Sequence, residues 1–117
     1  MSEVRLPAPV KARPVSDAFE QAKFGDGKPI AGAFSFDQAA EGAGFWGHIK
    51  FTCPCGCGSF SRLPIGLKTK PPTGIDANGI KATWEWDGNR ELPTLTPSIH
   101  HIDHWHGFLT KGMWTQA

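Results

Sequence analysis

The chain has 117 residues, and its 12 basic and 11 acidic side chains leave a formal net charge of +1. This length corresponds to one domain, and the balanced charge argues against a strongly nucleic-acid-binding or membrane-binding protein. The sequence has no apolar run near the ~18 residues that would span a bilayer, and its first residues lack the apolar core of a signal peptide. We therefore expect a soluble intracellular protein.

Frequent backbone breakers predict short strands. The chain contains 14 Gly and 10 Pro, together with 8 Phe and 5 Trp. Such a composition disfavours long helices, while aromatic residues suit strands. The expected fold is mainly β, a small antiparallel β-sandwich or open barrel stapled by a zinc site, with little helix. Residues 1–14 are expected to be an extended N-terminal arm, and residues 15–117 a single domain, beginning with a short helix over 16–23.

Alternation of apolar and polar residues locates the strands of this domain. The ranges expected to be extended are 33–36, 45–52, 59–67, 80–86, 92–99 and 104–110, after which a turn at 111–112 leads into 113–116. The second and third of these would form a hairpin, with the Cys-Pro-Cys-Gly-Cys-Gly turn of residues 53–58 at its tip.

This turn carries every cysteine of the chain, Cys53, Cys55 and Cys57. Three thiols within five positions are poor disulfide partners, and an odd number would leave one unpaired. Thiolates bound to a metal in a reducing compartment fit the spacing better. Gly56 and Gly58 would let backbone amides approach the sulfurs.

A second group of candidate ligands lies near the end of the chain. On a strand, His104 and His106 point to the same side together with Phe108, while Trp105 and Leu109 face the other way. A tetrahedral structural zinc could be held by two cysteines and two histidines, or by three cysteines and one histidine. Asp103 would cap a turn or orient a ligating imidazole.

Four motifs in order resemble a family of small phage and prophage proteins that often carry the label "ammonia monooxygenase". The motifs are Cys-Pro-Cys-Gly-Cys-Gly, Trp-Glu-Trp-Asp-Gly-Asn, Thr-Leu-Thr-Pro-Ser-Ile and His-Trp-His-Gly-Phe, within residues 46–115. The resemblance implies a zinc protein of a bacterial host's cytoplasm without an established activity. It matches Cys53 and Cys57 to an early cysteine pair and His106 to a late histidine. A late cysteine of many relatives falls on Trp105, so Cys55 or His104 would supply the remaining ligand.

The expected function is a small non-enzymatic zinc-binding module, phage or prophage encoded, that binds a host or phage protein. The sequence shows no convincing nucleophile–base pair, and the ligand set would close the metal site. Trp84, Trp86 and Trp114, with the loop 67–79, are candidate contact residues.

Two alternatives remain open. One is a metal-dependent hydrolase that uses His104 and His106, with Glu85 or Glu91 as a base. The other is a weak nucleic-acid-binding zinc protein. Its basic and aromatic surface would comprise Arg62, Lys68, Lys70, Lys81, Trp84 and Trp86.

Overall fold

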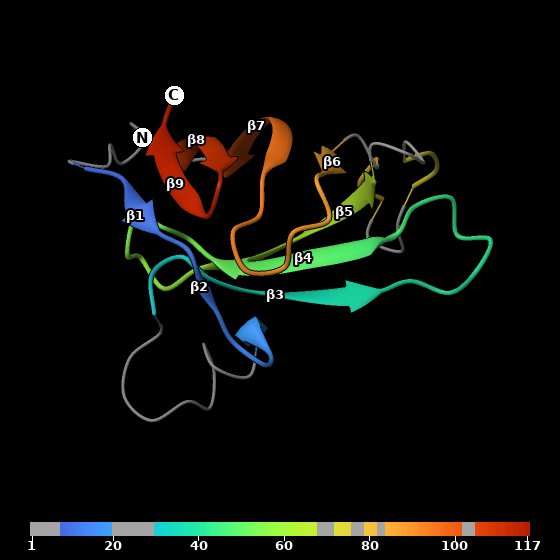
Figure 1. Ribbon diagram of the computed structural model, residues 1–117, viewed down its shortest axis with the longest axis horizontal. Helices are drawn as coiled ribbons and strands as arrows, with labels where there is room; N and C mark the ends of the chain where they lie inside the picture. The colour runs from blue at the N-terminus through green and yellow to red at the C-terminus, as the bar shows by residue number, and fades with distance from the viewer. Residues whose placement is uncertain (1–7, 20–29, 68–71, 76–78, 82–83, 102–104) are drawn as a thin grey trace.

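The computed structural model describes residues 8–19, 30–67, 72–75, 79–81, 84–101 and 105–117. Within these residues the chain forms nine strands (Figure 1). They are β1 (Val10–Lys11), β2 (Arg13–Pro14), β3 (Ala33–Gln38), β4 (Gly47–Thr52), β5 (Phe60–Leu67), β6 (Trp84–Trp86), β7 (Leu95–His101), β8 (Trp105–Thr110) and β9 (Met113–Gln116).

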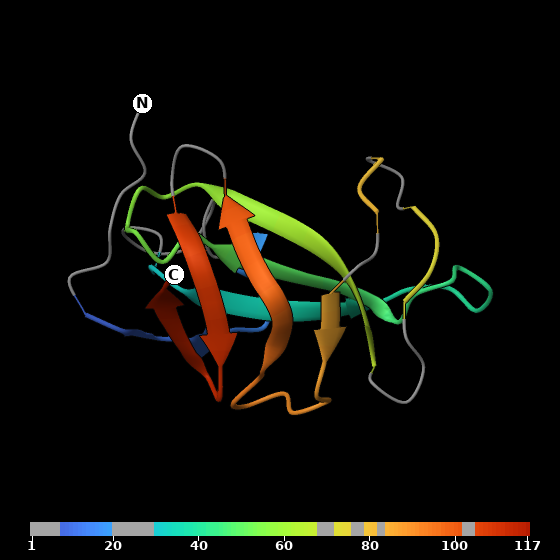
Figure 2. The ribbon, with the colours of Figure 1, turned by 90° about the horizontal axis from the view of Figure 1, so that it is seen from above.

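One curved sheet contains all nine strands, in the order β1-β9-β8-β7-β6-β5-β4-β3-β2. The pairings are antiparallel, except that β2 pairs with β3 and β5 with β6 in parallel. The sheet folds over on itself, so that β6 to β9 lie above β3 to β5 (Figures 1 and 2). The prediction of a mainly β domain of sandwich or open-barrel type is therefore confirmed.

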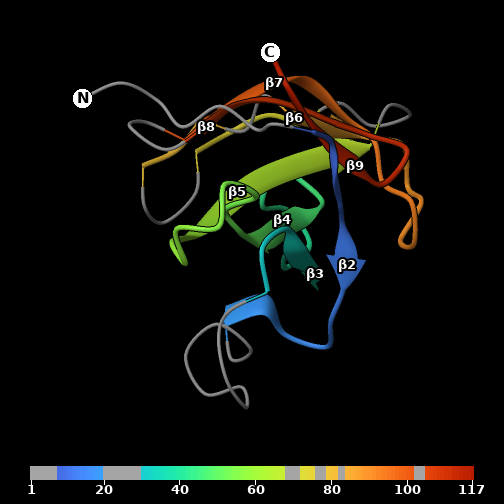
Figure 3. The ribbon, with the colours of Figure 1, turned by 90° about the vertical axis from the view of Figure 1, so that its left-hand side faces the viewer.

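The two edges of the sheet are joined by the segment from Val10 to Pro14. Its first half, β1, pairs with β9, and its second half, β2, pairs with β3. Between them, the Ala12 amide donates a 2.8 Å hydrogen bond to the Gly112 carbonyl, and Ala12 is 1% exposed. Figure 3 shows this segment crossing from the upper layer to the lower one. The expected extended arm thus contributes its last residues to the sheet, because they supply hydrogen bonds to both edges.

The space between the two layers is filled by large side chains. Trp114 is fully buried, and its ring centroid lies 4.9 Å from that of Phe51 and 5.5 Å from that of Trp105. Ile99 from β7 and Leu109 from β8 complete the cluster on this side. Alternate residues of β8 therefore point inward, and their neighbours form the outer face of the sheet. On β7, Leu95 and Ile99 are buried, whereas Thr96 and Pro97 between them are exposed.

The predicted hairpin is present. β4 and β5 pair antiparallel from Gly47↔Ile65 to Thr52↔Phe60, and the cysteine turn connects them. Residues 20–23 of the expected helix 16–23 lie outside the described ranges. Within the described part of this helix, Ala18 and Phe19 are helical. Among the described residues, no helix is long and apolar enough to cross a membrane.

The closure of the sheet generates a stability prediction at Gly32. Gly32 has φ +76°, and a Cβ atom there would lie 2.8 Å from the Trp114 indole. Gly42 has φ +87°, but a Cβ atom there would meet nothing within 4 Å. Gly42→Ala should cost about 1–2 kcal/mol of unfolding free energy from the backbone alone. Gly32→Ala should cost ~1–3 kcal/mol more than Gly42→Ala, because the added methyl group displaces the Trp114 indole that packs against Gly32.

Urea unfolding of both variants measures the difference. Equal losses in Gly32→Ala and Gly42→Ala would contradict the assignment of Trp114 and Gly32 to the closing contact.

Candidate functional site

The cysteine turn brings its three sulfur atoms together. The Sγ atoms of Cys53, Cys55 and Cys57 all lie within 4.8 Å of one another, and those of Cys53 and Cys55 are 3.1 Å apart. The turn is tied at its base by the Cys53 amide, which donates to the Ser59 carbonyl at 2.8 Å. Gly56 bends the chain with φ +87°. The result is a compact cluster of soft ligands, and such clusters suit a metal ion.

The environment separates the acidities of the outer two thiols. Burial raises the pKa of the Cys53 thiol; the backbone hydrogen bond from Cys55 opposes this increase, while the side chains of Cys55 and Cys57 add to it. Burial also acts on Cys57, but hydrogen bonds from Ser59 and from the two other cysteines outweigh it and lower its pKa to about 7. The Ser59 amide lies 3.4 Å from the Cys57 sulfur. The exposed end of the cluster is therefore the end most easily deprotonated.

A second chemical grouping lies on the outer face of β7 and β8. The Nε2 atom of His106 lies 3.2 Å from the hydroxyl oxygen of Ser98. The neighbours of these residues along the two strands, Ile99 and Trp105, point into the core. Ser98 and His106 therefore face away from the core, and both are half-buried.

The backbone holds His106 firmly in place. Its carbonyl accepts hydrogen bonds from the Gln116 side-chain amide at 3.1 Å and from the Ala117 amide at 3.0 Å. On the other side, His106 is opposite His100 in the antiparallel register of β7 and β8. A serine hydroxyl within hydrogen-bonding distance of a histidine ring nitrogen is the arrangement of a nucleophile and its general base.

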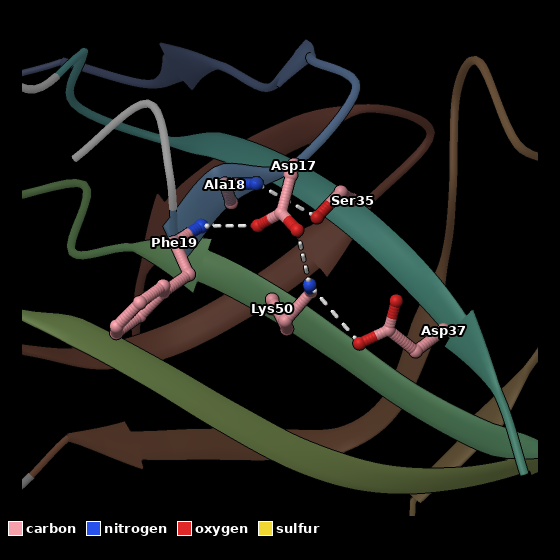
Figure 4. A network of polar contacts seen from close by, with 6 residues as sticks. All are labelled: Asp17, Ala18, Phe19, Ser35, Asp37 and Lys50. Carbon is pink, nitrogen blue, oxygen red and sulfur yellow. Dashed lines mark hydrogen bonds and ion pairs between the residues drawn. The ribbon is translucent and has the colours of Figure 1, made fainter. Parts of the chain in front are cut away.

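A second serine lies beside a basic residue in the lower layer. Ser35 and Lys50 are opposite one another on β3 and β4. The Lys50 ammonium, however, contacts the Asp17 carboxylate at 3.1 Å and the Asp37 carboxylate at 3.0 Å (Figure 4). The Ser35 hydroxyl accepts the Ala18 amide hydrogen at 2.9 Å.

Burial disfavours the charged form of Lys50, but the hydrogen bonds and charges of Asp37 and Asp17 outweigh it and raise the pKa of the ammonium above its ordinary value of 10.5. A general base must be able to give up its proton near neutral pH. Lys50 therefore remains protonated and cannot activate Ser35. This network instead attaches the start of the domain to β3 and β4.

The structure places the predicted ligands in two different environments. Cys53, Cys55 and Cys57 form the cluster, whereas His106 is hydrogen-bonded to Ser98 and is not part of the sulfur group among the described residues. His104 and Asp103 lie outside the described residues. The predicted alternation along β8 is observed, since Trp105 and Leu109 are buried and Phe108 is 42% exposed.

Ser98 was missed by the sequence analysis. It lies eight positions before His106, in the Thr-Pro-Ser-Ile segment, which matches no nucleophile motif. Ser98 and His106 could have been related only by predicting that segments 92–99 and 104–110 pair antiparallel, because this pairing brings the two side chains together.

Comparison with protein families supplies the class of protein to which this chain belongs. The family described as bacterial ubiquitination-like system serine protease (BubE) matches residues 25–117. The chain belongs to this family, since the match covers more than half of its length. Comparison with curated proteins finds no match, and neither does comparison with solved structures. The resemblance to small phage proteins stays a prediction.

The family corrects the expected function. The prediction of a non-enzymatic zinc module that acts by protein–protein interaction is wrong, because the family is one of serine proteases. The two alternatives, a metal-dependent hydrolase and a nucleic-acid-binding protein, disagree with the same description. The contact between Ser98 and His106, which the sequence did not reveal, was not available to that prediction.

The buried cation of the lower layer generates a prediction about pH. Because the pKa of Lys50 is raised on folding, its contribution to stability is complete below the unfolded-state pKa and is lost as the pH rises through the folded-state pKa. Lys50→Met should lower the unfolding free energy by about 1–2 kcal/mol at pH 7, a modest cost because both carboxylates are partly exposed.

Urea unfolding at pH 7 and above pH 10.5 tests this. The difference in unfolding free energy between the wild type and Lys50→Met should be smaller at the higher pH. Lys11→Met, which removes an exposed lysine, serves as the control and should show a small effect at both. If the loss of unfolding free energy in Lys50→Met is the same at both pH values, the ion pairs of Lys50 do not stabilise this layer.

Proposed function

We propose that this chain is a serine peptidase in which Ser98 is the nucleophile and His106 the general base, acting on a protein of a bacterial ubiquitination-like system. The observation that carries the proposal is the 3.2 Å contact between the Ser98 hydroxyl and Nε2 of His106. The family match supports the reaction class and the system in which the substrate is found.

The chemistry follows from the positions of the two side chains. Nε2 of His106 must accept the hydroxyl proton, so the neutral ring carries its own proton on Nδ1. As the proton moves to Nε2, Oγ of Ser98 attacks the carbonyl carbon of the scissile bond. The C–N bond then breaks, and the leaving amine takes the proton from His106. Water hydrolyses the resulting ester by the same route, which restores Ser98.

The location of the pair favours a protein substrate over a small molecule. Both side chains are on the outer face of the sheet, where an extended segment of another protein can reach them. Phe108 is on the same face of β8, two residues from His106, and the residue is 42% exposed. An exposed aromatic side chain beside the reacting groups provides apolar contact area for such a segment.

A fluorophosphonate probe tests the nucleophile without knowledge of the substrate. Oγ of Ser98 should displace fluoride from phosphorus, and mass spectrometry should locate the adduct on Ser98. Ser98→Ala should abolish labelling, and His106→Ala should slow it by at least ~10³-fold. Ser61→Ala, which removes another half-buried hydroxyl, should label like the wild type.

Labelling of folded Ser98→Ala at the wild-type rate would exclude Ser98 as the nucleophile. Circular dichroism establishes that each variant is folded before its rate is interpreted.

We further propose that the cysteine cluster binds a structural zinc ion. Zinc–sulfur bonds of ~2.3 Å in a tetrahedron place sulfurs ~3.8 Å apart, and the three sulfur atoms here lie within 4.8 Å of one another. When bound, the ion would offset most of the charge of the thiolates and hold the ends of β4 and β5 together. His104 is the candidate for a fourth ligand.

Metal analysis of the purified protein tests this site. We expect one zinc per chain in the wild type and in Ser61→Ala, and a loss of zinc in Cys53→Ser, Cys55→Ser and Cys57→Ser. The melting temperature should fall together with the zinc content, because the free energy of metal binding contributes to folding. Unchanged zinc and melting temperature in all three cysteine variants would contradict the proposal.

A further inference from the structure

A tryptophan on β6 contacts the backbone of the proposed nucleophile. The indole Nε1 of Trp84 donates a hydrogen bond to the carbonyl oxygen of Ser98 at 3.2 Å. We propose that Trp84 is a positioning residue that fixes the direction of the Ser98 side chain toward His106. This inference rests on the proposed function, since it assigns Trp84 a role in the same site.

The pairing of β7 explains why such a contact is needed. On one side, β6 pairs with β7 through Glu85↔Thr96 and Trp86↔Leu95. On the other side, the register with β8 shifts between Leu95 and Ile99. Ser98 therefore lies in a stretch where the regular ladder is interrupted. Irregularities of this kind redirect side chains, and they are common beside active sites.

The indole adds a hydrogen bond within this irregular stretch of β7. A hydrogen bond to the Ser98 carbonyl restrains the peptide plane that follows Ser98, and therefore the rotation of the backbone about its Cα atom. This rotation sets the direction in which the Cα–Cβ bond points. The Trp84 ring is itself packed against the hydrophobic core, so its N–H group is held at a fixed place. A rigid donor thus sets the orientation of the nucleophile.

The reacting contact is sensitive to this orientation. The distance of 3.2 Å between Oγ of Ser98 and Nε2 of His106 is long for a hydrogen bond donated by a hydroxyl group. A small rotation of Ser98 would break it. His106 is restrained in the same way on its own strand, because its carbonyl accepts the hydrogen bond of the Gln116 side chain. Each member of the pair is therefore held through its carbonyl by a neighbouring side chain.

Trp84→Phe isolates the role of the hydrogen bond. It removes the N–H group and keeps an aromatic ring on β6. Trp86→Phe is the matched control: Nε1 of Trp86 also donates to a backbone carbonyl, that of Asn89, at 3.0 Å. Trp86 is more deeply buried than Trp84, at 2% exposure, so its replacement should perturb folding at least as much.

The measurement is the rate of labelling by a small alkyl fluorophosphonate, resolved into the maximal rate and the concentration for half saturation, together with the melting temperature. We expect Trp84→Phe to lower the maximal rate by ~10–100-fold, because misplacement of reacting groups by about 1 Å has this effect. The half-saturating concentration should stay close to that of the wild type. Trp86→Phe should keep the wild-type maximal rate.

Other results would overturn the assignment. An unchanged maximal rate in folded Trp84→Phe would show that the hydrogen bond does not position Ser98. Equal decreases in Trp84→Phe and Trp86→Phe would show a general effect of stability, and a change confined to the half-saturating concentration would make Trp84 a contact of the probe. Ser98→Ala keeps the two proposals apart: if it abolishes labelling while Trp84→Phe does not alter the rate, the nucleophile stands and only the role of Trp84 falls.

Discussion

The closure of the sheet depends on the contact between the Trp114 indole and the Gly32 carbonyl. Nε1 of Trp114 donates to this carbonyl at 3.0 Å, across 82 positions of sequence. Trp114 and Gly32 thus lie where β9 approaches the start of β3. The Gly32 amide in turn donates a hydrogen bond to the carbonyl of Thr52 at the end of β4. One buried tryptophan therefore joins the last strand of the chain to the first two strands of the lower layer, and the short closing segment pairs on either side of it.

This closure supports the outer face on which the proposed reaction takes place. β9 is fixed by Trp114, β8 pairs with β9, and His106 is held on β8 by hydrogen bonds from the end of β9. Ser98 is one strand further from the joint, and its position also depends on Trp84. The inner face of these strands supplies the folding energy through residues such as Trp105 and Leu109, which are fully buried. The outer face can therefore carry a polar pair without opening the core.

The sequence predicted the parts of the fold that have a clear period. The strands around the cysteine turn and the alternation along β8 follow from the spacing of Phe51, Trp105 and Leu109, since each of these side chains is buried. The closing segment could not be predicted in this way. β1 and β2 have only two residues each, which is too short for a period, and their partners are far away in sequence.

The candidate site was predictable only in part for a similar reason. The cysteine cluster is local, and its residues are adjacent in sequence, so spacing alone identified it. The contact of Ser98 with His106 depends on the pairing of β7 with β8 and on the shift in register between Leu95 and Ile99. A period of two residues assigns each side chain to a face but does not specify which residues of two strands lie opposite one another.

The two sites also place competing demands on His106. A metal ion and the proton of a serine hydroxyl bind to the same lone pair of a neutral imidazole nitrogen, so Nε2 of His106 cannot serve both at once. Its contact with the Ser98 hydroxyl assigns that lone pair to the proposed catalysis. A metal ion bound at the cysteine cluster, in the β4–β5 turn, would then be held by the cysteines and by residues other than His106. The proposed metal binding and the proposed proton transfer are in this way assigned to different strands of one sheet, so each proposal can be tested by substitutions that leave the other group of residues unchanged.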